Sequence, residues 1–149
     1  MKKTYQGSCH CGAVRFECEL DLAPPGERSD PELPGVWWTS TFRCNCSSCL
    51  KTRFWKGFVL AKDFRLVQGG DAVADYQYGE KVVHHFFCRH CGIHPFANAS
   101  LEQMGGEFYA VNIACLDDAT PEELASAPIA YEDGRHDAWD RAPAETQHL

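Results

Sequence analysis

Apolar and polar positions alternate along the chain with a period of two in several stretches. Over 14–20, apolar side chains occupy every second position and alternate with charged ones, which indicates a strand with one buried face. The same period runs through 109–115. Stretches rich in β-branched and aromatic residues favour further strands over 36–43, 57–61 and 81–87. The hydrophobic pattern therefore predicts a mainly β protein.

Helical signals are short. Thr120 is a good cap residue, and Pro121 and two glutamates follow it, so one short helix is expected to begin there. A further turn or two of helix is expected over 47–52. The stretch 21–35 holds four of the eight prolines and is expected to be an inserted loop. The tail after Ala138 has no periodic pattern.

Composition and charge narrow the class of protein. Hydrophobic residues make up 44% and charged residues 23%, as in ordinary globular proteins. The net charge of -7 argues against nucleic acid as a general partner. Apolar runs are too short to span a membrane or to form a signal peptide. We therefore expect a reducing cytoplasm, where clustered cysteines bind metal more often than they pair.

The chain has nine cysteines, an odd number that disulfides alone cannot use. Cys18 and Cys115 stand apart, in phase with apolar neighbours, and are expected to be small buried side chains. The other seven fall in three clusters: Cys9 and Cys11; Cys44, Cys46 and Cys49; and Cys88 and Cys91.

The spacing within these clusters suits metal binding. Two thiolates three positions apart on a tight turn can bind one ion, and Gly92 after Cys91 permits the positive φ that such a turn often needs. Zinc is the default metal for thiolates. A structural zinc has four protein ligands, whereas a catalytic zinc has three and an open position. Seven ligands therefore divide into two zinc sites. The first, the four-cysteine cluster, is Cys9, Cys11, Cys88 and Cys91. The second, the three-cysteine cluster, is Cys44, Cys46 and Cys49.

Two alternatives remain open at this level. A histidine could close the three-cysteine cluster, which would make both metals structural and leave a module that binds a protein partner. The available histidines are His84, His85, His90 and His94. An iron–sulfur cluster is the other alternative.

The clusters also carry a resemblance. The chain resembles the glutathione-dependent formaldehyde-activating enzyme (GFA) family, which shares its domain with centromere protein V-like proteins. The resemblance rests on Cys9-His10-Cys11-Gly12, Cys44-Asn45-Cys46-Ser47-Ser48-Cys49 and Cys88-Arg89-His90-Cys91-Gly92. It implies one domain over 1–149, with a core of about 5–140 and an Mss4-like, zinc-containing β-sheet fold. It also implies the same division into a structural and a catalytic zinc.

The activity implied by the resemblance is that of a carbon–sulfur lyase, which joins formaldehyde to glutathione as S-hydroxymethylglutathione. The stretch 50–57 departs from many formaldehyde-activating members and looks more like the centromere protein V-like branch, so the substrate stays open. Thiol addition needs a proton carrier, and the candidates are His84, His85 and His94. The candidates for holding a small thiol such as glutathione by its carboxylates are Lys51, Arg53 and Lys56. Asn45 and Ser47 are expected to orient the metal loop.

Six of the seven charged residues within 43–65 are basic, whereas the chain beyond 116 is acidic. The basic segment could attract a small anion, or it could simply be a charged face exposed to solvent.

Overall fold

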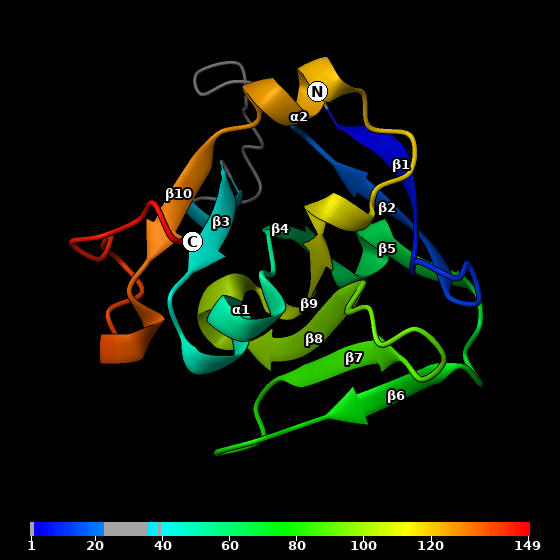
Figure 1. Cartoon of the computed structure of the whole chain (residues 1–149), viewed down its shortest axis with the longest axis horizontal. Helices are drawn as coiled ribbons and strands as arrows, with labels where there is room; N and C mark the ends of the chain where they lie inside the picture. Colours follow the sequence, from blue (N-terminus) through cyan, green and yellow to red (C-terminus); the bar gives the residue numbers. More distant parts are fainter. Residues whose placement is uncertain (1, 23–35, 39) are drawn as a thin grey trace.

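The computed structural model describes residues 2–22, 36–38 and 40–149, and in this part the chain forms two β-sheets (Figure 1). The smaller sheet has the order β1-β2-β5 and the larger β10-β3-β4-β9-β8-β7-β6. The strands of the smaller sheet are β1 (Lys3–Ser8), β2 (Arg15–Leu20) and β5 (Phe64–Gln68). Those of the larger sheet are β3 (Thr41–Cys44), β4 (Lys56–Leu60), β6 (Val73–Tyr76), β7 (His84–Cys88), β8 (Phe96–Leu101), β9 (Gly106–Asn112) and β10 (Ile129–Glu132).

The described part has two α-helices, both short: α1 (Ser47–Thr52) and α2 (Pro121–Ser126). The Thr120 side chain accepts a hydrogen bond from the Glu123 N–H, and the Glu123 carboxylate accepts one from the Thr120 N–H. This capping box satisfies N–H groups that the first turn of α2 cannot pair internally. The prediction of a mainly β protein with short helices is confirmed. No helix in the described ranges is long and apolar enough to cross a membrane.

The first alternating stretch is confirmed as β2. Phe16 and Cys18 are buried, whereas Arg15 and Glu19 on the opposite face are exposed. The segment 57–61 is likewise confirmed, as β4.

Three other strand predictions need correction. In the second alternating stretch β9 ends at Asn112, and Ile113–Cys115 forms a 3-10 turn in which the Asn112 side chain accepts the Ala114 N–H at 3.2 Å. Ala110, Val111 and Asn112 are all buried, so both faces of β9 are covered there, and Tyr109 earlier on the strand stacks on Phe64 of the smaller sheet. Over 36–43, Val36–Trp38 is a 3-10 turn and β3 begins only at 41. Over 81–87, β7 begins at 84. Most of the predicted proline-rich loop, 23–35, lies outside the described residues.

An aromatic cluster joins the two sheets. Phe64 of β5 stacks on Tyr109 of β9 with ring centroids 3.9 Å apart, and Phe16 and Phe64 each meet Phe96 of β8 edge-on. Each such aromatic pair contributes about 1 kcal/mol beyond its buried area. Gly7 lies against this cluster, since a Cβ there would come 2.2 Å from the Phe16 ring. The absence of a side chain at Gly7 makes room for the ring of Phe16, which pairs with it across β1 and β2.

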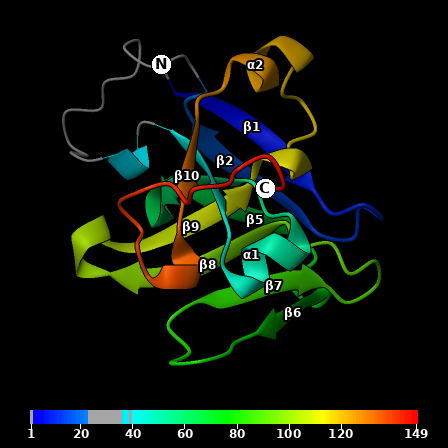
Figure 2. The same ribbon diagram turned by 60° about the vertical axis from the view of Figure 1, so that its left-hand side comes forward.

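The strand β10 forms one edge of the larger sheet. It lies beside β3 and pairs with it in parallel, which sets Glu132 opposite Cys44 (Figure 2). Helix α1 follows β3 after a two-residue connection. Together, β3, β10 and α1 position the second group of cysteines.

Candidate metal centres and an adjoining cavity

The four-cysteine cluster is built from two similar turns. One connects β1 to β2, and the other follows β7. In each turn the glycine after the second cysteine has a positive φ, 78° at Gly12 and 76° at Gly92. The Gly12 N–H donates to the Cys9 carbonyl at 3.1 Å, and the Gly92 N–H donates to the Cys88 carbonyl at 2.8 Å. The turn geometry expected from the CxxC spacing is therefore present at Gly92 and has a counterpart at Gly12.

The sulfurs of this cluster suit zinc. All four lie within 4.8 Å of one another. The Cys9 and Cys11 sulfurs are 3.6 Å apart, and the Cys11 and Cys88 sulfurs are 3.7 Å apart. A tetrahedral zinc with Zn–S bonds of about 2.3 Å needs sulfurs about 3.8 Å apart. The cluster can thus bind a metal ion, and such a bond would link the smaller sheet to the larger one.

The three-cysteine cluster forms at the junction of β3 and α1. The Cys44 sulfur accepts the Cys46 N–H at 3.3 Å, and the Cys46 sulfur accepts the Cys49 N–H at 3.4 Å as the cap of α1. These two bonds fold the connection so that all three sulfurs lie within 4.8 Å of one another. Among the residues the structure describes, no histidine nitrogen or carboxylate joins this group. Three sulfur donors this close together suit a zinc ion that keeps a fourth position open.

The protein holds negative charge in the three-cysteine cluster. Hydrogen bonds with Cys44 and Cys49 lower the pKa of Cys46 to about 2. Hydrogen bonds with Cys44 and Cys46 raise the pKa of Cys49. The cluster thus keeps a thiolate at Cys46, the form in which a sulfur binds a metal.

The segment after β10 contacts the three-cysteine cluster and the loop that carries it. The Asn45 amide donates to Asp133 Oδ1 at 2.7 Å and its oxygen accepts the Arg135 N–H at 2.9 Å, which fastens the metal loop to the turn at 133–135. A Cβ on Gly134 would lie 2.6 Å from the Cys44 sulfur. Asn45 therefore orients the loop as the sequence suggested, and Gly134 makes room for Cys44. Ser47, proposed for the same role, is exposed.

A buried ion pair lies beside the cluster. The Lys56 ammonium bonds to the carboxylate of Glu132, and both side chains are at most one-tenth exposed. Burial by itself would lower the pKa of Lys56, but attraction to Cys49 and Glu132 outweighs it, so the pKa of Lys56 is raised and the ammonium persists. A positive charge is therefore fixed next to the sulfurs.

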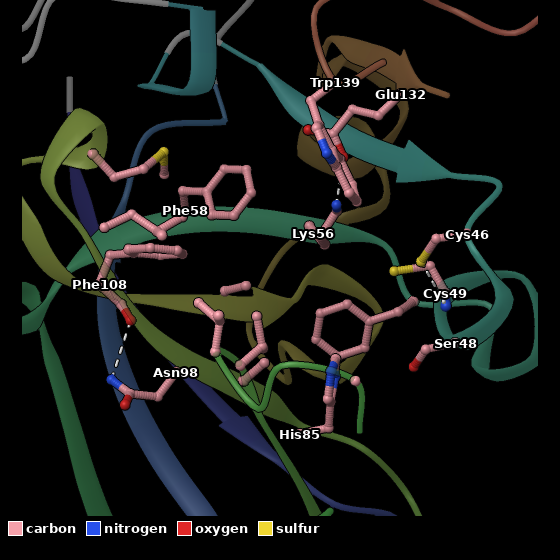
Figure 3. Close-up of a pocket in the computed structure, with 18 of the residues that line it drawn as sticks. Cys46, Ser48, Cys49, Lys56, Phe58, His85, Asn98, Phe108, Glu132 and Trp139 are labelled. Atoms are coloured by element: carbon pink, nitrogen blue, oxygen red, sulfur yellow. Dashed lines mark hydrogen bonds and ion pairs between the residues drawn. The ribbon is translucent and has the colours of Figure 1, made fainter. Parts of the chain in front are cut away.

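A cavity of about 660 Å³ adjoins the three-cysteine cluster (Figure 3). Cys46, Ser48 and Cys49 lie at one end in this view, and Phe58 and Phe108 lie at the other. No cysteine of the four-cysteine cluster is among the described residues that line the cavity. The two clusters therefore differ in their access to a small molecule.

The predicted proton carriers are divided by the structure. His85 and His94 line the cavity, and burial lowers the pKa of both. The ring of His85 stacks on that of Tyr78 at 5.1 Å. His84 is not part of the lining and instead contacts Asp75, with its Nδ1 2.6 Å from the carboxylate. His85 and His94 are thus the two candidates that can meet a ligand of the cavity.

The predicted carboxylate-binding residues are also separated. Lys56 reaches the cavity but is paired with Glu132. Lys51 is exposed on α1, and Arg53 donates to the carbonyl of His148 at 2.5 Å; neither lines the cavity. Arg43, from the same basic segment, packs its guanidinium 5.1 Å from the Trp55 ring. Much of the basic segment is therefore engaged in internal contacts.

Sequence reasoning missed several residues of this site. Glu132 and Gly134 follow the metal loop by almost ninety positions and carry no motif of their own. Phe54 and Phe58 line the cavity, but no motif in the sequence singled them out. The one available signal was the acidic charge beyond 116, which could have been matched to the basic segment that it partly neutralises.

The chain is similar to one known protein family and to a solved structure. The model of the family described as glutathione-dependent formaldehyde-activating enzyme matches residues 4–132. A crystal structure of a Rhodobacter sphaeroides protein is similar with a TM-score of 0.60 and 30% sequence identity. That match covers 84% of this chain and 99% of the other.

Proposed function

The chain belongs to the glutathione-dependent formaldehyde-activating enzyme family, and from this premise we propose that it is a zinc-dependent carbon–sulfur lyase acting on a small thiol–aldehyde adduct. The three-cysteine cluster would hold the catalytic zinc, and the four-cysteine cluster would hold a structural one. We also propose a cytoplasmic location, because a reducing compartment keeps all nine cysteines free of disulfide bonds, as they are in the structure.

One observation supports catalysis over a purely structural role. The three-cysteine cluster adjoins the 660 Å³ cavity, whereas the four-cysteine cluster lines no part of it. A metal that only stabilises a fold has no need of a cavity at its side. An open position facing a cavity is the arrangement that catalytic zinc sites use.

The chemistry proposed is the reversible addition of a thiol to an aldehyde. When bound, zinc supplies a Lewis acid that favours the thiolate form of a ligand. Burial lowers the pKa of His85, so its ring is neutral at pH 7 and a ring nitrogen can accept the proton that the thiol releases. The sulfur–carbon bond then forms, and the ring returns the proton to the aldehyde oxygen. The Lys56 ammonium offsets the negative charge of the sulfurs throughout.

The alternative is a non-catalytic module with two structural metals and a surface for a protein partner. It requires a fourth protein ligand on the three-cysteine cluster. Within the described ranges no histidine nitrogen lies in that group, which disfavours closure by His84, His85, His90 or His94.

The test is the rate of exchange between free thiol and adduct, measured by NMR on the zinc-loaded protein. Formaldehyde is paired with glutathione in one series and with phenylmethanethiol in another. We expect at least one pair to exchange faster in proportion to protein concentration, and Cys49→Ser to abolish the acceleration. Cys115→Ser is the matched control, because Cys115 is buried outside both clusters. No acceleration with either pair, or with 2-mercaptoethanol and phenylacetaldehyde as a third pair, would contradict the proposal.

A further inference from the structure

We propose that the cavity beside the three-cysteine cluster selects adducts whose organic group is large and apolar, in preference to the adduct of glutathione. The inference rests on the proposed function and names the substrate class for that same site. Three features of the cavity carry it: the chemistry of its walls, its size and the sign of the charges at its edge.

The walls of the cavity are predominantly aromatic and aliphatic. Phe58 and Phe108 meet edge-on with ring centroids 5.6 Å apart. Val83, Ala97 and Ala110 add aliphatic surface, and they belong to one packed cluster that includes Phe58 and Cys49. Asn98, a polar group on this wall, uses its amide on the Phe108 carbonyl at 3.1 Å and on Glu107 at 3.2 Å. Burial of apolar ligand surface against such walls is favourable, because it removes that surface from water.

The volume of the cavity far exceeds the needs of formaldehyde. Sites for small organic ligands typically have about 300–1,000 Å³, and the 660 Å³ found here falls within that range. Formaldehyde contributes a single carbon to an adduct. A larger organic group must therefore fill most of the space next to the reacting carbon–sulfur bond.

The charges at the cavity disfavour an anionic ligand. Among the described lining residues the cations are Lys56 and Lys81, and the carboxylates are Glu80, Glu132, Asp137 and Asp140. The ion pair of Lys56 with Glu132 leaves one lysine against three carboxylates. Glutathione carries two carboxylates and one ammonium, so its adduct would meet a surface of its own sign. A neutral apolar adduct avoids this repulsion.

The basic residues that follow the three-cysteine cluster in the sequence do not offset the excess of carboxylates at the cavity. Lys51 and Arg53 lie outside the lining, and Arg53 already donates to the His148 carbonyl. The sequence expectation that they would meet glutathione carboxylates thus has no support from their positions. The apolar walls, in contrast, lie directly beside Cys49.

The apolar group could enter on either partner of the reaction. In both cases a bond forms between the thiol sulfur and the aldehyde carbon, and the thiol proton moves to the aldehyde oxygen, with no change of oxidation state. A hydrophobic thiol with formaldehyde and a small polar thiol with a hydrophobic aldehyde therefore produce the same kind of occupant. Separate reactions distinguish the two sources.

The experiment compares exchange rates of three pairs on the zinc-loaded protein: phenylmethanethiol with formaldehyde, 2-mercaptoethanol with phenylacetaldehyde, and glutathione with formaldehyde. We expect kcat/KM for at least one phenyl-bearing pair to exceed that for glutathione by about tenfold or more, which one or two well-buried apolar contacts can supply. An equal or higher value for glutathione would overturn this inference and leave the proposed function intact.

Two valine variants test the location. Val83 lies on the cavity wall, so Val83→Lys should lower kcat/KM for the phenyl-bearing pair by about tenfold and reduce its advantage over glutathione. Val67→Lys is the matched control, because Val67 is 46% exposed on β5 and lies outside the lining. Equal effects of the two variants would overturn the assignment.

A binding measurement separates the two proposals. 2-Phenylethanol resembles the organic group but cannot form the adduct. We expect it to shift the NMR signals of the Val83 methyl groups and not those of Val67. If no pair is turned over, the proposed function fails, and these shifts alone decide whether the cavity takes an apolar ligand. Absence of shifts at millimolar 2-phenylethanol would refute the cavity assignment.

Discussion

The buried pair of Lys56 and Glu132 should respond to mutation as a unit. Glu132→Gln removes the carboxylate and leaves the Lys56 ammonium buried beside neutral groups and the cysteine sulfurs. Lys56→Met removes the ammonium and leaves the carboxylate buried. Because both side chains are at most one-tenth exposed, water cannot take the place of the missing partner. Each single variant should therefore be strongly destabilised.

The expected magnitudes follow from the burial of the pair. Breaking a buried ion pair costs about 3–5 kcal/mol, whereas replacing both members by apolar residues is often close to neutral. The double variant Lys56→Met/Glu132→Leu should thus lose much less than the sum of the two single losses. Lys3→Met provides the matched control, since Lys3 pairs with Glu123 at 2.9 Å but is 47% exposed. Its loss should not exceed about 1 kcal/mol.

Urea unfolding at a fixed free zinc concentration measures these differences. With a slope of about 2 kcal/mol/M, a loss of about 4 kcal/mol lowers the midpoint by about 2 M. Zinc content is measured in parallel, so that metal loss is not mistaken for loss of the ion pair. Additive single effects, or a Lys56→Met variant no less stable than Lys3→Met, would show that the buried pair does not act as a unit.

Further predictions concern the metal sites. Cys49→Ser should lose one zinc per chain and stay folded, whereas Cys91→Ser should impair folding, because a structural zinc contributes folding free energy. Zinc stoichiometry and circular dichroism measure both effects. Equal unfolding of the two variants would contradict the division into a catalytic and a structural zinc. Gly134→Ala places a Cβ against the metal loop and should cost about 1–3 kcal/mol and weaken zinc binding at the three-cysteine cluster. Gly70→Ala, whose Cβ would meet nothing closer than 3.8 Å, should leave zinc binding unchanged in a chelator competition.

The two groups of cysteine sulfurs that could bind metal were predictable because their geometry is local. Cys44, Cys46 and Cys49 belong to one connection between a strand and a helix, so their spacing alone limits the distances between their sulfurs. Cys88 and Cys91 lie on one tight turn for the same reason. Their combination with the N-terminal pair followed from the number of ligands that a structural zinc requires.

The surroundings of the cluster were not predictable in this way. Glu132 meets Lys56 because β10 pairs in parallel with β3, a contact that no local pattern specifies. Lys56 was expected to bind a ligand, since a lone basic residue in a sequence gives no sign that it is buried. The alternating pattern over 109–115 predicted a strand with one solvent face that continues to 115. The strand β9 ends at Asn112 and is covered on both faces, so the alternation does not mark a solvent face.

The proposed function depends on a metal at the three-cysteine cluster with an open position that a thiol can occupy. Cobalt substitution at this cluster allows thiol binding to be measured, because a thiol that binds as a fourth sulfur ligand changes the visible absorption of the metal. We expect a saturable spectral change on addition of phenylmethanethiol, and its loss in Cys49→Ser. A spectrum of the wild-type protein that stays unchanged up to millimolar thiol would contradict the open position.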